Sequence, residues 1–244
     1  MKSQAAEALR KLMRQYCKTP GDEGFKAAMR LSKLGPDPEA EEILNNIRQN
    51  GATLELRIMA AAILGMFSTP ERVKKASETL QSAALQKNDQ NLPELRLLAV
   101  WQLGVIGEME TLGLLAGDAK IGRMVQIAAI KSLERLGQVD AAAQYWILLA
   151  QQKGGDATLA DRVEAALAAG YLEHPRARQV LLTLGRKVTA ETARECYQAA
   201  DALYYLGYYA DALSLYLNLA AAWHGNAEIA KAARAALRRR PLEG

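Results

Sequence analysis

Four stretches of the chain share one pattern: LRIMAAAILG at 56–65, LRLLAVWQLG at 95–104, VQIAAIKSL at 125–133 and RVEAALAAG at 162–170. In each stretch, apolar residues recur at three- and four-residue steps, the spacing of one face of an α-helix. Self-similarity at a step of about 20–50 residues is typical of arrays of short structural units. The pattern therefore predicts a repeated helical unit.

Two looser copies extend the array, at 25–35 and 193–207. Anchors at positions 24, 57, 96, 126, 162 and 196 follow one another at steps of roughly 30–40 residues, and each step accommodates two helices and their turns. We therefore predict an all-α fold, an αα-superhelix (solenoid) of about six helical hairpins over residues 24–223. Flanking helices at 1–18 and 226–240 are expected to cap it, and the whole of 1–244 is interpreted as a single domain.

Local signals predict where these helices begin and end. Leu-Gly near the end of the first helix of a unit predicts a left-handed stop. The side chains of Asp37, Thr53 and Thr158, and of Asn91 with Glu94, are predicted N-caps. The second helix of the third unit, at 108–116, is expected to be short.

The first predicted helix is amphipathic. Ala5, Leu9, Leu12, Met13 and Tyr16 recur at helical spacing. The cations Arg10, Lys11 and Arg14 are placed on the opposite face. We therefore expect the apolar side to pack inward.

The units resemble HEAT repeats of the armadillo-like superfamily, in which an Ala-rich first helix has Val/Leu-Arg at its start and Leu-Gly near its end. Arg57, Arg96 and Arg162 occupy the position of that family's common arginine, whereas Gln126 and Cys196 depart from it. The resemblance implies stacked helical hairpins whose second helices line the concave face.

The last repeat also resembles a tetratricopeptide repeat. Gly207, Tyr208, Tyr209, Ala212 and Tyr216 follow that family's spacing of Gly, aromatic, Ala and aromatic residues. Gly137, Val139, Ala142 and Trp146 repeat the spacing less well, two repeats earlier in the chain. In tetratricopeptide arrays the first helices line the concave face, whereas in HEAT arrays the second helices do. The two resemblances therefore imply different helices on the concave face, and we favour HEAT-like stacking.

Composition argues against several classes of protein. His174 and His224 are the only histidines, and no metal-binding, nucleotide-binding or catalytic motif is present, so we expect no enzyme activity, metal or cofactor. The net charge of +4 is spread along the chain, which argues against nucleic-acid binding. Cys17 and Cys196 are interpreted as small buried residues. The absence of a signal peptide or of a membrane-spanning apolar run predicts a cytoplasmic protein.

The aromatic residues suggest where a partner could bind. Tyr204, Tyr205, Tyr208, Tyr209 and Tyr216 crowd into one repeat. Helical spacing predicts that Tyr209 and Tyr216 are buried, and that Tyr204, Tyr205 and Tyr208 cannot all point inward. Exposed tyrosines are favoured at recognition surfaces.

A cationic segment precedes this repeat. Ala177, Val180, Leu181 and Leu184 are expected to point inward, which leaves Arg176 and Arg178 outside. We therefore take Tyr204, Tyr205, Tyr208, Arg176 and Arg178 as candidate partner-binding residues.

The expected function is a scaffold or adaptor, without catalysis, that binds a protein or peptide partner, and a monomer is favoured. Two alternatives come from families with HEAT-like repeats. One is a lyase or chaperone that handles bilin chromophores, and the other is a nucleic-acid-binding protein like the alkylpurine DNA glycosylases.

Overall fold

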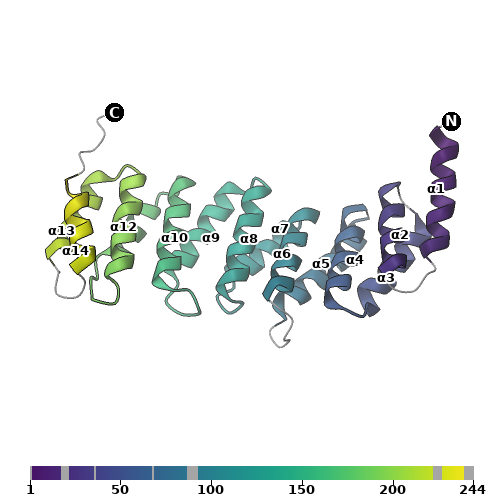
Figure 1. Cartoon of the computed structure of the whole chain (residues 1–244), viewed down its shortest axis with the longest axis horizontal. Coiled ribbons are helices and arrows are strands. Elements are labelled where there is room, and N and C mark those ends of the chain that lie inside the picture. The colour runs from purple at the N-terminus through teal and green to yellow at the C-terminus, as the bar shows by residue number, and fades with distance from the viewer. Residues whose placement is uncertain are drawn as a thin grey trace. The chain divides into compact units, whose positions relative to one another are not determined.

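The computed structural model describes residues 2–17, 22–35, 37–67, 69–86, 93–221 and 227–238, and every regular element in this part of the chain is a helix (Figure 1). In chain order the helices are α1 Lys2–Cys17, α2 Asp22–Lys33, α3 Pro38–Asn50, α4 Leu54–Phe67, α5 Pro70–Leu85, α6 Pro93–Ile106, α7 Met109–Gly117, α8 Arg123–Arg135, α9 Val139–Gln151, α10 Leu159–Tyr171, α11 Ala177–Gly185, α12 Ala193–Tyr205, α13 Tyr209–Ala221 and α14 Ala227–Ala236. The prediction of an all-α chain is confirmed over these residues.

The repeat pattern corresponds to pairs of helices. Positions 57, 96, 126, 162 and 196 are each the fourth residue of a helix, in α4, α6, α8, α10 and α12. Each of these first helices is followed by a second helix before the next copy of the pattern begins. The sequence therefore placed the repeating unit correctly.

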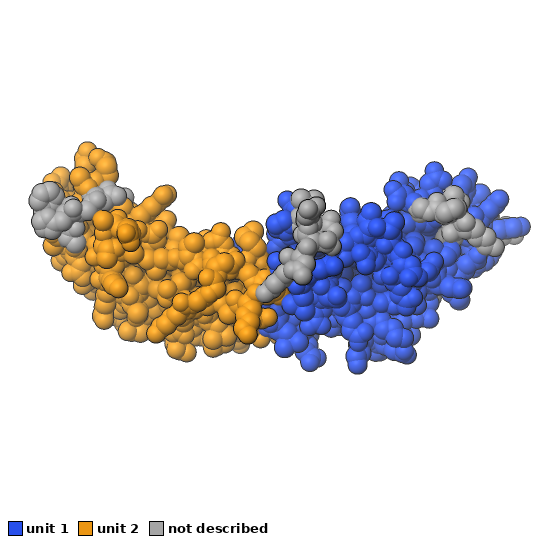
Figure 2. Space-filling view, turned by 90° about the horizontal axis from the view of Figure 1, so that it is seen from below, with its two compact units in different colours: residues 1–116, 127–136 blue, residues 117–126, 137–244 orange. Residues whose placement is uncertain are grey.

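The chain forms two compact units (Figure 2). Unit 1 comprises Met1–Ala116 with Ile127–Leu136, and unit 2 comprises Gly117–Gln126 with Gly137–Gly244, so α8 contributes to both.

Each unit has the neighbour-to-neighbour packing of an α-solenoid. In unit 1, α2 contacts α4 and α4 contacts α6. In unit 2, α10, α12 and α14 pack successively as a first-helix layer, and α9, α11 and α13 as a second-helix layer. Large buried side chains fill the space between the helices; they include Leu31, Leu44 and Leu64 in unit 1 and Ile147, Leu181 and Leu203 in unit 2.

The repeated fourth residue connects one pair to the next. The Nε atoms of Arg96 and Arg162 each donate a hydrogen bond of 2.9 Å to a backbone carbonyl twelve residues earlier, those of Ala84 and Ala150. Both carbonyls lie in the last turn of the preceding helix, where the helix itself provides no donor. Cys196 replaces the arginine in the last of these helices, and its Sγ lies 3.8 Å from the carbonyl oxygen of Leu184, also twelve residues earlier.

The prediction that Leu-Gly forms a left-handed stop is confirmed in two copies, where Gly35 and Gly207 have φ values of +127° and +83°, and is wrong in the others described here. Gly65, Gly104 and Gly170 lie inside their helices, and none has a positive φ. They instead provide space between repeats: a Cβ atom on Gly170 would lie 2.3 Å from Cδ1 of Leu206. After α6 and α10 the left-handed residue comes three positions later, at Gly107 and Glu173.

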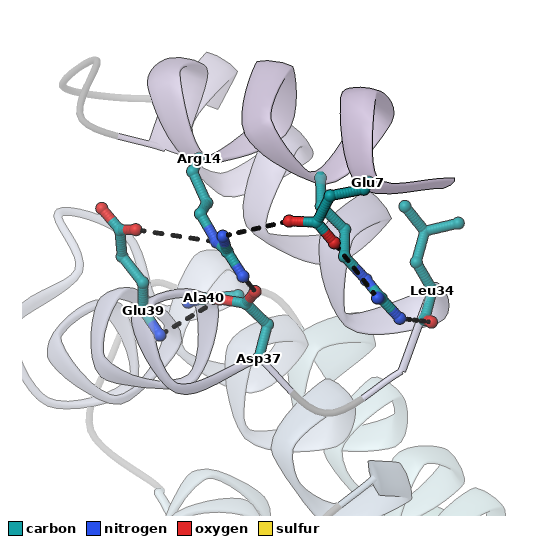
Figure 3. Close-up of polar contacts among 7 residues, drawn as sticks. Glu7, Arg14, Leu34, Asp37, Glu39 and Ala40 are labelled. Atoms are coloured by element: carbon teal, nitrogen blue, oxygen red, sulfur yellow. Dashed lines mark hydrogen bonds and ion pairs between the residues drawn. The ribbon is translucent and has the colours of Figure 1, made fainter. Parts of the chain in front are cut away.

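The expected orientation of the first helix is contradicted at two of its five apolar residues; the side chains of the other three, Ala5, Leu9 and Met13, lie outside the described part. Leu12 and Tyr16 of α1 are about half exposed. The arginines make the contacts instead: Arg10 donates to the carbonyl of Leu34 at 3.0 Å, and Arg14 binds the carboxylate of Asp37 (Figure 3). Charged hydrogen bonds to the end of α2 and the start of α3 therefore hold α1 through its cationic side.

The predicted caps at Asp37, Thr53 and Thr158 are confirmed. Asp37 Oδ1 accepts the backbone N–H groups of Glu39 and Ala40, and Thr53 Oγ1 accepts that of Leu56. Thr158 forms a capping box with Asp161. The proposed cap at Asn91 lies outside the described residues. As expected, α7 is short, at nine residues.

No helix within the described ranges is both long and apolar enough to cross a bilayer.

Candidate protein-binding surface

The turns within the pairs of unit 2 bring the candidate residues together. Tyr171 ends α10 and Tyr205 ends α12, and each helix is followed by a turn that leads into the second helix of its pair. In the α12–α13 turn, Gly207 has φ +83°, and the N–H of Tyr208 donates to the carbonyl of Leu203. Glu173 adopts the same left-handed conformation after α10, with φ +59°. These turns place aromatic side chains on the edge of the unit where first helices meet second helices.

Arg178 organises one part of this edge. Its guanidinium forms an ion pair with Asp211, in the first turn of α13, and lies 5.4 Å from the centre of the Tyr208 ring. The hydrogen bond to Asp211 raises the pKa of Arg178. Arg178 thus links α11 to the α12–α13 turn and orders the Tyr208 ring, which remains 40% exposed.

Tyr204 supports its neighbours. Its ring is half-buried and meets the Tyr205 ring edge-on at 6.2 Å and the Tyr209 ring at 5.1 Å, measured between ring centres. Tyr205 is 66% exposed and is the most accessible of the predicted tyrosines. We therefore assign Tyr204 to packing and Tyr205 to the surface.

The prediction that Tyr209 is buried is wrong, whereas the prediction for Tyr216 is confirmed. Tyr209 is 42% exposed because it opens α13, and side chains in a helix lean toward its N-terminus. Tyr216 is buried inside the pair, and its hydroxyl donates to Asp201.

Arg176 and His174 lie on the same edge. Arg176 is exposed, and its guanidinium is 3.4 Å from Oε1 of Gln151. His174 Nδ1 accepts the backbone N–H of Arg176, and its Nε2 lies 3.0 Å from Gln144, so this histidine stabilises the turn as the sequence indicated. The residues of α11 predicted to point inward, Ala177, Val180, Leu181 and Leu184, are buried.

We call the set Tyr171, Arg176, Arg178, Tyr205 and Tyr208 the aromatic edge. Tyr171 was missed from the sequence although it is 62% exposed. Its position in the repeat could have identified it, because Tyr171 and Tyr205 are both the last residue of a 13-residue first helix.

A groove begins at the aromatic edge. Tyr205 lines it at one end, between α10 and α12, and its volume is about 330 Å³. Val163, Leu167 and Ala202 give it an apolar floor, and Glu164 and Gln198 stand on its sides. A similar apolar groove of about 540 Å³ runs between α6 and the part of α8 in unit 1, where the exposed Trp101 lines it.

The groups with shifted pKa values in unit 2 have structural roles. Burial raises the pKa of Asp161, but hydrogen bonds from Thr158 and Arg123 outweigh this effect and lower it overall. Burial raises the pKa of the Cys196 thiol, consistent with its prediction as a small buried residue. Among the residues that the structure describes, no three His, Cys, Asp or Glu side chains are grouped to hold a metal ion.

Several residues singled out in the sequence lie outside the described part. These are His224 and the side chains of Ala5, Leu9, Met13 and Cys17. No family model, curated protein or solved structure matches the chain.

Proposed function

We propose that the chain is a HEAT-like interaction module, a scaffold or adaptor without catalytic activity, that binds a protein or peptide partner through the aromatic edge of unit 2. The observation that carries this proposal is the exposure of Tyr171, Tyr205 and Tyr208, with the guanidinium of Arg178 over the Tyr208 ring. Tyrosine and arginine are enriched where partners bury surface, because both combine a large contact area with polar groups.

The edge is also preorganised. Arg178 forms an ion pair with Asp211 and contacts the Tyr208 ring, while the Tyr204 ring contacts that of Tyr205 edge-on. A side chain that is already ordered loses less entropy when a partner binds. The groove beside Tyr205 offers a continuous apolar surface to a segment of the partner.

HEAT-like stacking is supported by the arginine at the fourth position of the first helix. Arg96 and Arg162 both connect one pair to the next through the same hydrogen bond; Arg57 occupies the equivalent position, but its buried Nε makes no such bond. In such arrays, extended surfaces rather than enclosed pockets carry recognition.

The experiment is affinity capture from native lysate with the full chain as bait. The double variant Tyr205→Ala/Tyr208→Ala removes two exposed rings and leaves Tyr204 in place. The matched control is Tyr16→Ala, an exposed tyrosine of unit 1. We expect a stoichiometric protein partner that the control retains and the double variant loses, with unchanged circular dichroism for both.

Two results would count against the proposal. If the double variant captured the partner as well as the unmodified chain does, the aromatic edge would not take part in the interaction. Recovery of nucleic acid or of a coloured chromophore, without a protein partner, would favour one of the two alternative functions.

A further inference from the structure

A second pocket of unit 2 lies where α9, α10 and α11 meet. Its volume is about 270 Å³. The buried side chains of Ala150, Val180 and Leu184 give it an apolar floor. Pockets that hold whole drug-sized ligands have volumes of about 300–1,000 Å³, so this pocket is suited to one small group.

The polar side chains around this floor provide positive charge and hydrogen-bond donors. Arg162 of α10 and Lys153, just after α9, are cations, and no carboxylate lines the pocket in the part of the chain that the structure describes. Gln151 also lines it, and its Oε1 already lies 3.4 Å from a guanidinium nitrogen of Arg176. The NH₂ group of Gln151 therefore remains as a donor.

Arg162 is a half-buried cation without a counter-charge. Its Nε donates to the carbonyl of Ala150 at 2.9 Å, and it forms no ion pair with any described residue. Burial lowers the pKa of Arg162, whereas the hydrogen bond to Asp211 raises the pKa of Arg178. Because burial of an unpaired charge is costly, an anion bound beside Arg162 would be stabilised.

The surroundings favour a carboxylate over a phosphate group. With Nε occupied, Arg162 keeps its two Nη groups, and a guanidinium binds a carboxylate through two parallel hydrogen bonds. Ala150 and Gln151 belong to the last turn of α9, so the pocket lies at a carbonyl end of a helix. Phosphate groups are typically bound by the N–H groups at the start of a helix.

We propose that this pocket binds a carboxylate joined to a short apolar group. The carboxylate lies against Arg162 and Lys153, and the apolar group covers Val180 and Leu184. The C-terminal residue of a peptide and a free branched-chain carboxylic acid both have this chemistry. The residues of the aromatic edge do not line the pocket, and the inference does not rest on the proposed function.

The test is an NMR titration of the isotope-labelled full chain. The probe is isocaproate, and its uncharged amide, isocaproamide, has nearly the same shape. We expect isocaproate to shift the backbone N–H signals of Ala150 and Thr183, which both line the pocket, with a Kd of about 1 mM. Isocaproamide is expected to bind at least about tenfold more weakly, because it lacks the charge that Arg162 pairs with.

A further probe distinguishes the two sources of the carboxylate. It is an acetylated tripeptide that ends in leucine with a free carboxylate. Tighter binding of the tripeptide than of isocaproate would assign the pocket to the C-terminus of a peptide. Tighter binding of isocaproate would assign it to a free acid, and both results support the proposal.

Variants locate the bound carboxylate. Arg162→Met is expected to weaken isocaproate binding by at least about tenfold. Lys153→Glu changes an exposed residue and is expected to weaken it by at least about fivefold, so it tests the pocket even if Arg162→Met does not fold. The matched control is Arg96→Met, which removes the equivalent hydrogen bond to Ala84 in unit 1 and is expected to bind like the unmodified chain.

Other results would overturn the proposal. These are no shift of the two signals at about 20 mM isocaproate, equal binding of isocaproamide, and phosphate binding as tight as that of isocaproate. Unchanged affinity in Arg162→Met or in Lys153→Glu would show that the carboxylate does not lie against these cations. An equal loss of binding in Arg96→Met would show that the effect comes from the stability of the array and not from the pocket.

Discussion

Replacing Asp37 separates two interactions made by one buried carboxylate. Oδ1 accepts the N–H groups of Glu39 and Ala40 at the start of α3, while Oδ2 accepts two hydrogen bonds from Arg14 at 2.7 and 3.0 Å. Asp37→Ala removes both sets. Asp37→Asn keeps an acceptor for the N-cap, because asparagine caps helices as well as aspartate does, and removes the charge that Arg14 binds.

The expected cost follows from the burial of this cap. Loss of an N-cap costs about 0.5–2 kcal/mol, and we expect about 2 kcal/mol for Asp37→Ala because the carboxylate is only 3% exposed. In a protein of this size, such a loss lowers the melting temperature by about 5 °C. Asp37→Asn is expected to lose less than half of that amount, since Arg14 is well exposed and its ion pair is screened by water.

The pH dependence gives a second and independent result. Burial raises the pKa of Asp37, but the hydrogen bonds from Arg14, Ala40 and Glu39 outweigh it, so the pKa in the folded state is lowered. The carboxylate therefore stabilises the folded chain fully above its unfolded pKa of about 3.9, and this contribution is lost as the pH falls through the lower folded value. The decrease in the free energy of unfolding caused by Asp37→Asn should be constant near neutral pH and should become smaller below about pH 4.

The assay needs a local readout, because helical arrays often unfold in stages. Amide hydrogen exchange of Glu39 and Ala40 reports the start of α3 directly, and thermal melting of unit 1 gives the overall effect. Equal destabilisation by Asp37→Ala and Asp37→Asn at pH 7 would refute the role of the cap. If the stability lost through Asp37→Asn stayed the same down to pH 3, the ionised pair with Arg14 would be refuted.

Three further predictions concern unit 2. Glu173→Gly should raise the free energy of unfolding by about 1 kcal/mol, because it removes a side chain from a left-handed residue; an unchanged urea midpoint would contradict the strain at this turn. Arg162→Met should cost about 1 kcal/mol and speed amide exchange at the end of α9, because the carbonyl of Ala150 loses its partner; exchange as slow as before would count against the link between pairs. In a Cys17→Ser background, Cys196 should react with a thiol reagent at least about a hundredfold more slowly in the folded than in the unfolded chain, since burial raises the pKa of its thiol; fast labelling would show that the thiol is accessible.

The sequence predicted the order of the helices because the same pattern of residues recurs at nearly the same place in each helix pair. Five of the six anchors, position 162 among them, are the fourth residue of a first helix, and position 24 is the third residue of α2, so local spacing and self-similarity agree closely. The Leu-Gly pair was interpreted correctly at Gly35 and Gly207 but not at Gly65 and Gly104, because a glycine can serve a turn or a close contact equally well. Gly170 serves the contact with Leu206, which belongs to the next repeat and cannot be seen from local sequence.

The faces of helices were harder to predict than their existence. The apolar spacing of α1 suggested that Leu12 and Tyr16 point inward, but both are about half exposed, and Arg10 and Arg14 on the other side make hydrogen bonds to Leu34 and Asp37. These bonds depend on the end of α2 and the start of α3, which come later in the chain and lie outside any local pattern. In the candidate surface, Tyr205 and Tyr208 were found because too many aromatic residues follow one another near the end of one helix for all of them to be buried.

The central claim, that the aromatic edge binds a protein, is tested most directly by photo-cross-linking inside cells. A photoreactive phenylalanine analogue replaces Tyr205, and in a matched sample it replaces the exposed Tyr16 of unit 1. The account predicts a discrete covalent adduct with a protein from position 205 and none from position 16. Adducts of equal yield from both positions, or none from position 205, would contradict it.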